Sequence, residues 1–260
     1  MPSIRRLFKI MCVAVGAFIV STAGTFATTE IKVVGYHFPP FVDDYGGLTP
    51  KLIDDLNALQ SDYTFVFKKT TPARRYRDLE TGRGDMVFFE MPKWGWSKSK
   101  VPIEETREIL TGKEVYLALK KPGRDQSYFK NITTKRIAAI SGYHYGFANF
   151  NSDPKWLKKH FNISLTQNHT TNIRVLRADR VDISIVNVSY LQKYFKENSG
   201  VRSHILISDK EDQTYRLKAI TRKGSPIKIA ELEALLEVAK QRGVFDRLLK
   251  FYGLTDQLSF

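Results

Sequence analysis

The sequence has a single cysteine among its 260 residues, and that cysteine lies close to the amino terminus. Cys12 falls within the uncharged, mostly apolar run of residues 10–20, which follows Arg5, Arg6 and Lys9. If the chain is cleaved after this run, the mature protein contains no cysteine. This excludes disulfides, thiol catalysis and cysteine-ligated zinc from the mature protein.

The amino-terminal region also lacks an apolar run of transmembrane length. The run at 10–20 has 11 residues, whereas a spanning helix needs roughly 20. Thr25-Phe26-Ala27 then supplies a small-x-small cleavage site. A basic start, a short apolar run and such a site form the order of a secretory signal peptide. We therefore expect residues 1–27 to be a removed signal peptide, in preference to a membrane anchor, and the mature protein to be periplasmic.

Recognisable catalytic and metal-binding motifs are missing as well. The sequence contains no G-x-S-x-G, no H-E-x-x-H and no glycine-rich phosphate loop. Its five histidines are scattered, without the close spacing that a metal cluster needs. We therefore predict no catalytic residues, no metal site and no cofactor.

Acidic residues are in the minority. The chain has 41 Lys and Arg against 27 Asp and Glu, and three of the basic residues lie before residue 10, which leaves the mature chain with a net charge of +11. The basic residues are scattered and form no long block, so we expect no nucleic-acid partner. Our first interpretation of the positive charge is a solvated surface, and our second is a bias toward acidic ligands or an anionic membrane surface.

The rest of the chain alternates strand-like and helix-like segments. Strands are predicted at 31–36, 63–67, 85–89, 115–119, 136–140 and 181–186. A first helix is predicted to begin at Thr49-Pro50, with Thr49 as its N-cap, and further helices are predicted at 72–81, 153–161 and 188–196. Near the carboxyl terminus, another helix is predicted to begin at Ser225-Pro226, and the last helix is predicted to end at Gly253. This alternation favours an α/β protein with mostly parallel sheets covered on both faces.

Five short signatures occur in a fixed order along the chain. They are Gly35–Phe41 (GYHFPPF), Gly47-Leu48, Leu79-x-x-Gly82-x-Gly84-Asp85, Leu176-x-x-x-Arg180-Val181-Asp182 and Ala219-Ile220-x-Arg222-Lys223-Gly224-Ser225. In this order, behind a signal peptide, they resemble the bacterial extracellular solute-binding proteins of the amino-acid-binding type, known as family 3. The resemblance covers nearly the whole mature chain.

The resemblance implies the type II periplasmic-binding-protein fold, an α/β fold with two lobes. Each lobe has a mixed, mainly parallel sheet flanked by helices, and two crossing strands join the lobes. Lobe 1 would comprise residues 28–115 and 216–260, and lobe 2 residues 116–215. It further implies a monomer that captures a small polar solute between the lobes by hinge closure and presents it to a membrane permease of an ABC transporter.

The resemblance also implies where the solute would bind. In lobe 1, Phe38 matches the ligand-stacking aromatic residue, with Tyr36 beside it, and Arg75 is placed to hold an acidic group. The loop after the third strand would add Glu90, Lys93, Trp94 and Trp96. In lobe 2, Ser141, Gly142 and Tyr143 match a ligand-binding loop, and Asn187 ends a strand at the cleft. We interpret the neighbouring His144 as a surface residue.

Two positions depart from the pattern of amino-acid binders. Ser97 stands near the place of the arginine that clamps the ligand carboxylate, and Asn187 stands at the place of the aspartate that pairs with the ligand ammonium group. Asparagine can still form hydrogen bonds but carries no charge. The departures put an ordinary α-amino-acid ligand in doubt.

Two alternative functions remain open for a chain of this kind. The same fold serves in sensors or adaptors that contact a membrane receptor, and a few relatives are dehydratases or lytic transglycosylases. In an enzyme on this fold, Glu90 would be the first candidate for the catalytic carboxylate.

Overall fold

The structure is a computed structural model that describes residues 28–259. The predicted signal peptide at 1–27 lies outside the described residues. Within them, no helix combines the length and the apolar character that crossing a membrane requires.

Lobe 1 is built on three parallel strands. β1 (Thr29–Gly35) lies between β2 (Tyr63–Lys69) and β3 (Met86–Glu90). The end of β9 (Ile205–Arg222) pairs with β3 in the antiparallel direction, and the short β4 (Ile103–Glu105) pairs antiparallel with β9 in turn. All five residues of β3 are buried, as expected for a strand covered on both faces.

Lobe 2 repeats this arrangement. β6 (Ile137–Ile140) lies between β7 (Ile163–Thr166) and β8 (Ile183–Asn187), and all three strands are parallel. β5 (Leu110–Leu119) pairs with β8 in the antiparallel direction. In each lobe, three parallel strands are therefore followed by an antiparallel strand from the connection between the lobes, β9 in lobe 1 and β5 in lobe 2.

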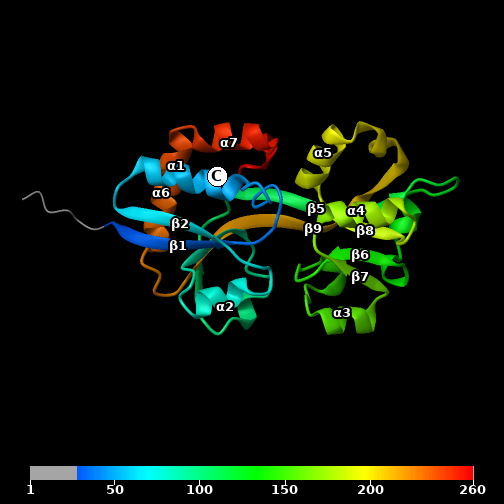
Figure 1. Cartoon of the computed structure of the whole chain (residues 1–260), viewed down its shortest axis with the longest axis horizontal. Coiled ribbons are helices and arrows are strands. Elements are labelled where there is room, and N and C mark those ends of the chain that lie inside the picture. Colours follow the sequence, from blue (N-terminus) through cyan, green and yellow to red (C-terminus); the bar gives the residue numbers. More distant parts are fainter. Residues whose placement is uncertain (1–27, 260) are drawn as a thin grey trace, which may run out of the picture.

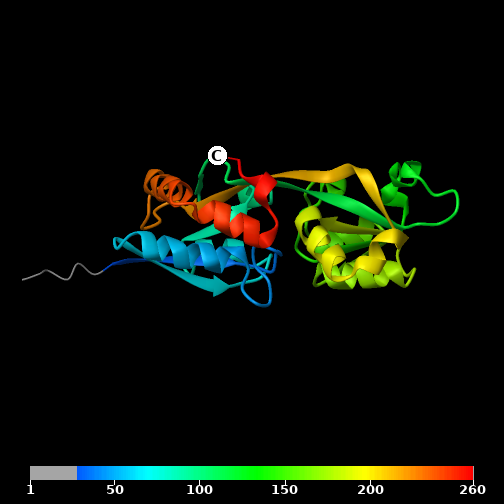
Figure 2. The same ribbon diagram turned by 90° about the horizontal axis from the view of Figure 1, so that it is seen from above.

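The two lobes are joined by β5 and β9, which form one long antiparallel pair from Leu110 opposite Leu217 to Leu119 opposite Ile205. Figures 1 and 2 show these two strands running from one lobe into the other. Their register shifts beside Glu114 and Val115. The predicted boundaries, at 115/116 and 215/216, fall within this pair of strands.

Helices cover both faces of each sheet (Figure 1). In lobe 1, α1 (Leu48–Leu59), α6 (Ile229–Gln241) and α7 (Val244–Tyr252) lie on one face and α2 (Arg75–Glu80) on the other. In lobe 2, α4 (His169–Arg177) and α5 (Val188–Glu197) lie on one face and α3 (Pro154–His160) on the other. The predicted class, an α/β fold with two lobes and mainly parallel sheets flanked by helices, is confirmed.

Two predicted helix starts are wrong. α1 begins at Leu48, and Thr49 is its second residue rather than its N-cap. The backbone amides of Leu48 and Thr49 donate to the carbonyls of Pro40 and Phe41, at 3.0 and 2.8 Å, so the helix start needs no side-chain cap. α6 begins at Ile229, after the predicted Ser225-Pro226 start. The predicted end of α7 at Gly253 is confirmed, since Gly253 adopts the left-handed conformation there.

The helix predicted at 72–81 is shorter, and one strand–helix unit was not predicted at all. Residues 72–74 form a turn, and α2 begins only at Arg75. β7 and α4 were not predicted because β7 has only four residues and α4 consists mainly of polar and charged residues. Of β9, only the part near 215–220 was expected, as the second crossing strand that the resemblance implies, since polar residues between Asp209 and Thr214 interrupt its apolar pattern.

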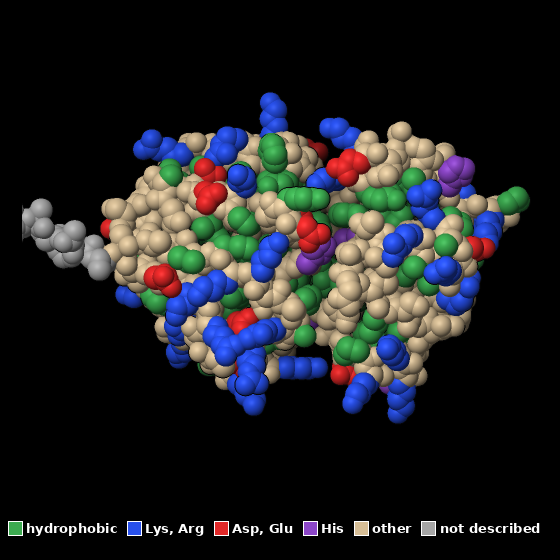
Figure 3. Space-filling view, viewed as in Figure 1, with side chains coloured by type: hydrophobic (Ala, Val, Ile, Leu, Met, Phe, Trp, Pro, Cys, Tyr) green, Lys and Arg blue, Asp and Glu red, His purple; other side chains and the backbone are tan. Residues whose placement is uncertain are grey.

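Basic side chains are distributed over the surface of both lobes, as Figure 3 shows for one face. Lys68, Lys69, Arg74 and Arg83 border one hollow beside α2.

Candidate ligand-binding site

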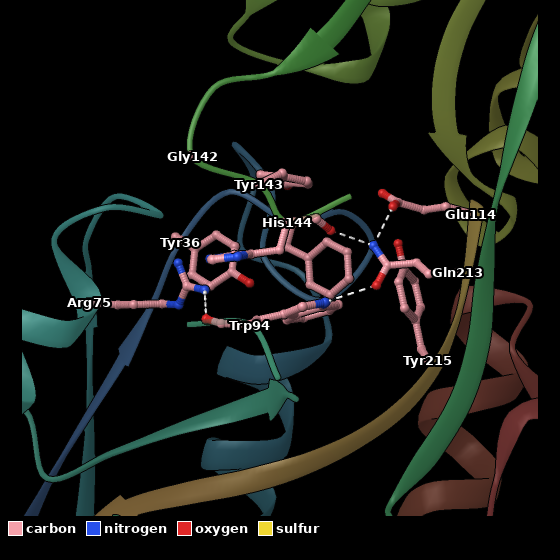
Figure 4. Close-up of a pocket in the computed structure, with 10 residues that line it drawn as sticks. Tyr36, Arg75, Trp94, Glu114, Gly142, Tyr143, His144, Gln213 and Tyr215 are labelled. Atoms are coloured by element: carbon pink, nitrogen blue, oxygen red, sulfur yellow. Dashed lines mark hydrogen bonds between the residues drawn. The ribbon is translucent and has the colours of Figure 1, made fainter. Parts of the chain in front are cut away.

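A small cavity lies between the lobes beside the β5–β9 pair (Figure 4). Its walls come from both lobes and from both connecting strands. The lining residues are Tyr36, Phe38, Arg75, Trp94, Glu114, Gly142, Tyr143, His144, Gln213 and Tyr215. Its volume is about 10 Å³, which is room for about one water molecule.

Aromatic rings make up much of the wall. Phe38 is the central ring, and its centroid lies 5.7 Å from that of Trp94, 5.9 Å from that of Tyr143 and 5.7 Å from that of Tyr215. Tyr36 stacks on Phe38 with a centroid distance of 6.1 Å. Because the other three contacts are edge-to-face, some rings turn a face and others an edge toward the cavity.

The loop that follows β1 presents Phe38 to the cavity. The amide of Phe38 donates to the carbonyl of Val42 at 2.9 Å, and the amide of Phe41 donates to the carbonyl of Phe38 at 2.8 Å. The chain thus turns back on itself immediately after the strand. Phe41 stacks on Phe89 behind this loop with a centroid distance of 4.7 Å, which fixes the loop on the core.

Arg75 and Glu90 form a fully buried ion pair behind the aromatic wall, with Arg75 Nε 3.0 Å from Glu90 Oε1. The indole Nε1 of Trp96 donates to Glu90 Oε2 at 2.8 Å, and the guanidinium of Arg75 lies 4.3 Å from the ring centroid of Tyr76. Burial raises the pKa of Glu90, and the Arg75 charge opposes that rise. The charge of Arg75 is therefore compensated within the protein.

Lobe 2 closes the cavity with Gly142 and Tyr143. The Tyr143 hydroxyl donates to the carbonyl of His37 in lobe 1, and its ring meets that of Tyr36 edge-on at 6.0 Å. Gly142 has a φ of +80°, and a Cβ placed there would lie 3.0 Å from Cβ of Pro72 in lobe 1. The structure is thus a closed form in which lobe 2 packs directly on lobe 1.

Replacing Gly142 by alanine is expected to favour an open form. The added methyl would meet Pro72 across the lobes, which opposes closure. The positive φ adds a separate cost of about 1–2 kcal/mol for alanine. Small-angle scattering should show a larger radius of gyration. Gly123→Ala is the matched control, because Gly123 also has a positive φ, +71°, but nothing lies within 4 Å of its added Cβ. An equal effect of both substitutions would contradict the proposed lobe contact.

Gln213 connects three of the cavity walls (Figure 4). Its Oε1 accepts from the indole Nε1 of Trp94 at 2.9 Å, and its Nε2 donates to Glu114 Oε2 at 2.7 Å and to the carbonyl of His144 at 2.6 Å. The side-chain amide of Gln213, on a connecting strand, thereby contacts both lobes. The orientation of this amide therefore depends on whether the lobes are closed.

His144 is buried, so its interpretation as a surface residue is wrong. Its Nε2 lies 2.7 Å from the Tyr76 hydroxyl, and its Nδ1 lies 2.6 Å from the carbonyl of Phe150. Burial lowers the pKa of His144 to about 4, and the Arg75 charge adds to this effect. His144 is therefore neutral at pH 7 and bridges the two lobes through Tyr76.

Six of the eleven residues predicted for the site line the cavity: Tyr36, Phe38, Arg75, Trp94, Gly142 and Tyr143. Glu90 and Trp96 support Arg75 from behind. The other three make different contacts. Lys93 is exposed with Nζ 4.5 Å from the Phe150 ring centroid, and the Ser141 amide donates to the Thr166 carbonyl at 2.9 Å.

Asn187 lies outside the cavity lining and is engaged in three structural contacts, one of them between its Nδ2 and Nε2 of His169 at 3.0 Å. Its Oδ1 accepts from the amide of Tyr190 at 2.7 Å, which caps α5. Its Nδ2 donates to the carbonyl of Pro39 in lobe 1 at 2.9 Å. Asn187 therefore links the lobes in this closed form.

Sequence reasoning missed four residues that line the cavity: Glu114, His144, Gln213 and Tyr215. Three of them, Glu114, Gln213 and Tyr215, belong to the connecting strands. The available signal for these was a carboxylate and an amide next to the expected crossings between the lobes. Among the described residues, no group of three or more His, Cys, Asp or Glu side chains is arranged to hold a metal ion.

No family model matches the sequence, and no curated protein matches it. Solved structures match over most of the chain. The protein Tv2483 bound to L-arginine has a TM-score of 0.67 at 14% identity, covering 86% of this chain and 90% of its own.

Two further structures match in the same way. An ABC uptake transporter substrate-binding protein from Streptococcus pneumoniae with bound histidine has a TM-score of 0.66 at 16% identity, covering 86% of this chain and 92% of its own. An ancestral amino-acid-binding protein, a precursor of cyclohexadienyl dehydratase, has a TM-score of 0.62 at 18% identity, covering 86% and 95%. This chain therefore has the two-lobed fold of these amino-acid-binding proteins.

Proposed function

We propose that this protein is a periplasmic solute-binding protein that captures a small organic solute between its lobes by hinge closure and presents it to a membrane transporter. The observation that carries the proposal is the position of the cavity. Both lobes and both connecting strands contribute side chains to one enclosed, mainly aromatic space, and ligand sites of two-lobed proteins form at such interfaces.

Solute capture requires the lobes to separate first. A cavity of about 10 Å³ is far smaller than the roughly 300–1,000 Å³ of typical ligand pockets. Tyr143 and Gly142 belong to lobe 2 and would leave with it, whereas Phe38, Tyr36 and Trp94 would stay on lobe 1. A solute then favours reclosure only through its additional contacts with the closed form.

Phe38→Ala is expected to weaken solute binding at least tenfold, because Phe38 is the central ring of the wall. Thermal shift of residues 28–260 against a panel of neutral, acidic, basic and zwitterionic metabolites identifies the solute, and calorimetry then gives Kd for both proteins. Tyr45→Ala is the control, since Tyr45 is an almost fully exposed aromatic residue. A solute that binds only the folded protein must stabilise it, so no shift at saturating concentrations would overturn the proposal.

The proposal includes a monomeric protein, a permease as the membrane partner and no catalytic activity. The buried, paired state of Glu90 supports the last point, because its carboxylate is held by Arg75 and Trp96 behind the cavity wall. A pull-down from membranes should recover a permease. Recovery of a signalling receptor would favour a sensor or adaptor, and turnover of the bound solute would favour an enzyme.

A further inference from the structure

Glu114 is a buried carboxylate in the wall of the cavity. It lies in β5 at the register shift between the lobes and is 1% exposed. Gln213 donates to its Oε2 at 2.7 Å. Figure 4 shows its carboxyl group on the side of the cavity away from Arg75.

Glu114 has no positive partner within the part of the chain that the structure describes. None of the ion pairs there includes it, and its neighbour Asp212 is a second acid. The other titratable groups that interact with it are Tyr116, Tyr143, Tyr145 and Tyr215. Burial raises the pKa of Glu114 to about 8, and the Asp212 charge adds to the rise. An isolated buried carboxylate is costly unless a cation compensates it.

The cavity offers a cation a second kind of contact. Five rings line it: Tyr36, Phe38, Trp94, Tyr143 and Tyr215. Aromatic faces attract ammonium groups, and the attraction is strongest when the contact is shielded from water. A carboxylate beside several rings is therefore suited to an amine.

The cavity offers a ligand carboxylate no comparable partner. Arg75 is the one cationic side chain in the lining, and Glu90 already neutralises it at 3.0 Å. Lys93 is exposed and lies outside the lining. A zwitterion would therefore bring a negative charge into a site whose only ionisable carboxyl group, that of Glu114, is without an opposite charge.

We propose that the captured solute is a net cation, an organic ammonium compound without a carboxylate, whose nitrogen pairs with Glu114 among the aromatic rings. This inference rests on the proposed function of solute capture and specifies its ligand class. The solute enters when the lobes open and is enclosed when Tyr143 returns to lobe 1.

Pairs of compounds that differ by one carboxylate test the inference. The wild-type protein is titrated at pH 8 with choline and glycine betaine, putrescine and ornithine, tyramine and tyrosine, and histamine and histidine. At least one amine is expected to bind at least tenfold tighter than its carboxylated partner. Its affinity should rise about tenfold per pH unit from pH 6 to 7 and level off above pH 8, because the cation binds the ionised form of Glu114.

Glu114→Gln should weaken binding of that amine at least tenfold and remove the pH dependence. Glu211→Gln is the matched control, because Glu211 is an acid on β9 that pairs with Lys113 near the surface. If the Glu114 variant does not fold, the pH dependence of amine affinity in the wild-type protein tests the role of Glu114 instead. Preference for a neutral, acidic or zwitterionic solute would overturn this inference and leave solute capture standing, whereas absence of binding by every class would overturn both.

Discussion

Replacing Glu90 by glutamine is expected to lower the free energy of unfolding by about 3–5 kcal/mol. Glutamine retains an acceptor for the Trp96 indole but removes the charge that compensates Arg75. Arg75 is fully buried, and arginine does not lose its proton in proteins. Breaking a buried pair leaves an uncompensated charge, which accounts for the size of the effect. Urea denaturation at pH 7 measures it.

Two further variants separate this effect from the loss of one hydrogen bond. Arg75→Met/Glu90→Met removes both charges and should be clearly more stable than Glu90→Gln, since apolar replacement of a whole buried pair is often neutral. Glu108→Gln breaks the pair with Arg216, which is 75% exposed, and should cost less than about 1 kcal/mol. A cost below that value for Glu90→Gln would contradict the ion pair.

The repeating strand–helix pattern was sufficient to predict an α/β protein, whereas the two lobes were implied by the resemblance of the five signatures. β6 is a continuous apolar run, β3 is apolar up to its last residue, and α7 ends at a glycine, so local sequence and tertiary structure agree there. The connecting strands were harder to recognise. β9 runs for 18 residues through a polar centre, because the segment between the lobes faces the cleft and solvent rather than a core.

The site was only partly predictable for a related reason. Phe38, Tyr36 and Tyr143 follow strands and could be placed at the cleft from the chain order alone. The pairing of charged side chains with one another could not be predicted from the chain order. Arg75 was expected to hold an acidic ligand, and the structure shows that an acid of the same lobe, Glu90, contacts it. Glu114 was missed because one polar residue in a strand has the pattern of an exposed position.

The same residue gives a stability test that needs no ligand. The pKa of Glu114 is raised from 4.5 to about 8 by burial, so the folded protein binds more protons than the unfolded chain between these values. Stability then falls as the pH rises through this range. Glu114→Gln removes the penalty and should be about 3–5 kcal/mol more stable than wild type at pH 9, with almost no difference at pH 4, at 1.36 kcal/mol per pKa unit.

Urea denaturation at both pH values, with Glu211→Gln as control, measures this difference. A variant no more stable than wild type at pH 9 would mean that a cation of the protein already compensates Glu114. A stabilised variant would show that the chain retains an unpaired carboxylate at the expense of stability, as binding sites commonly do.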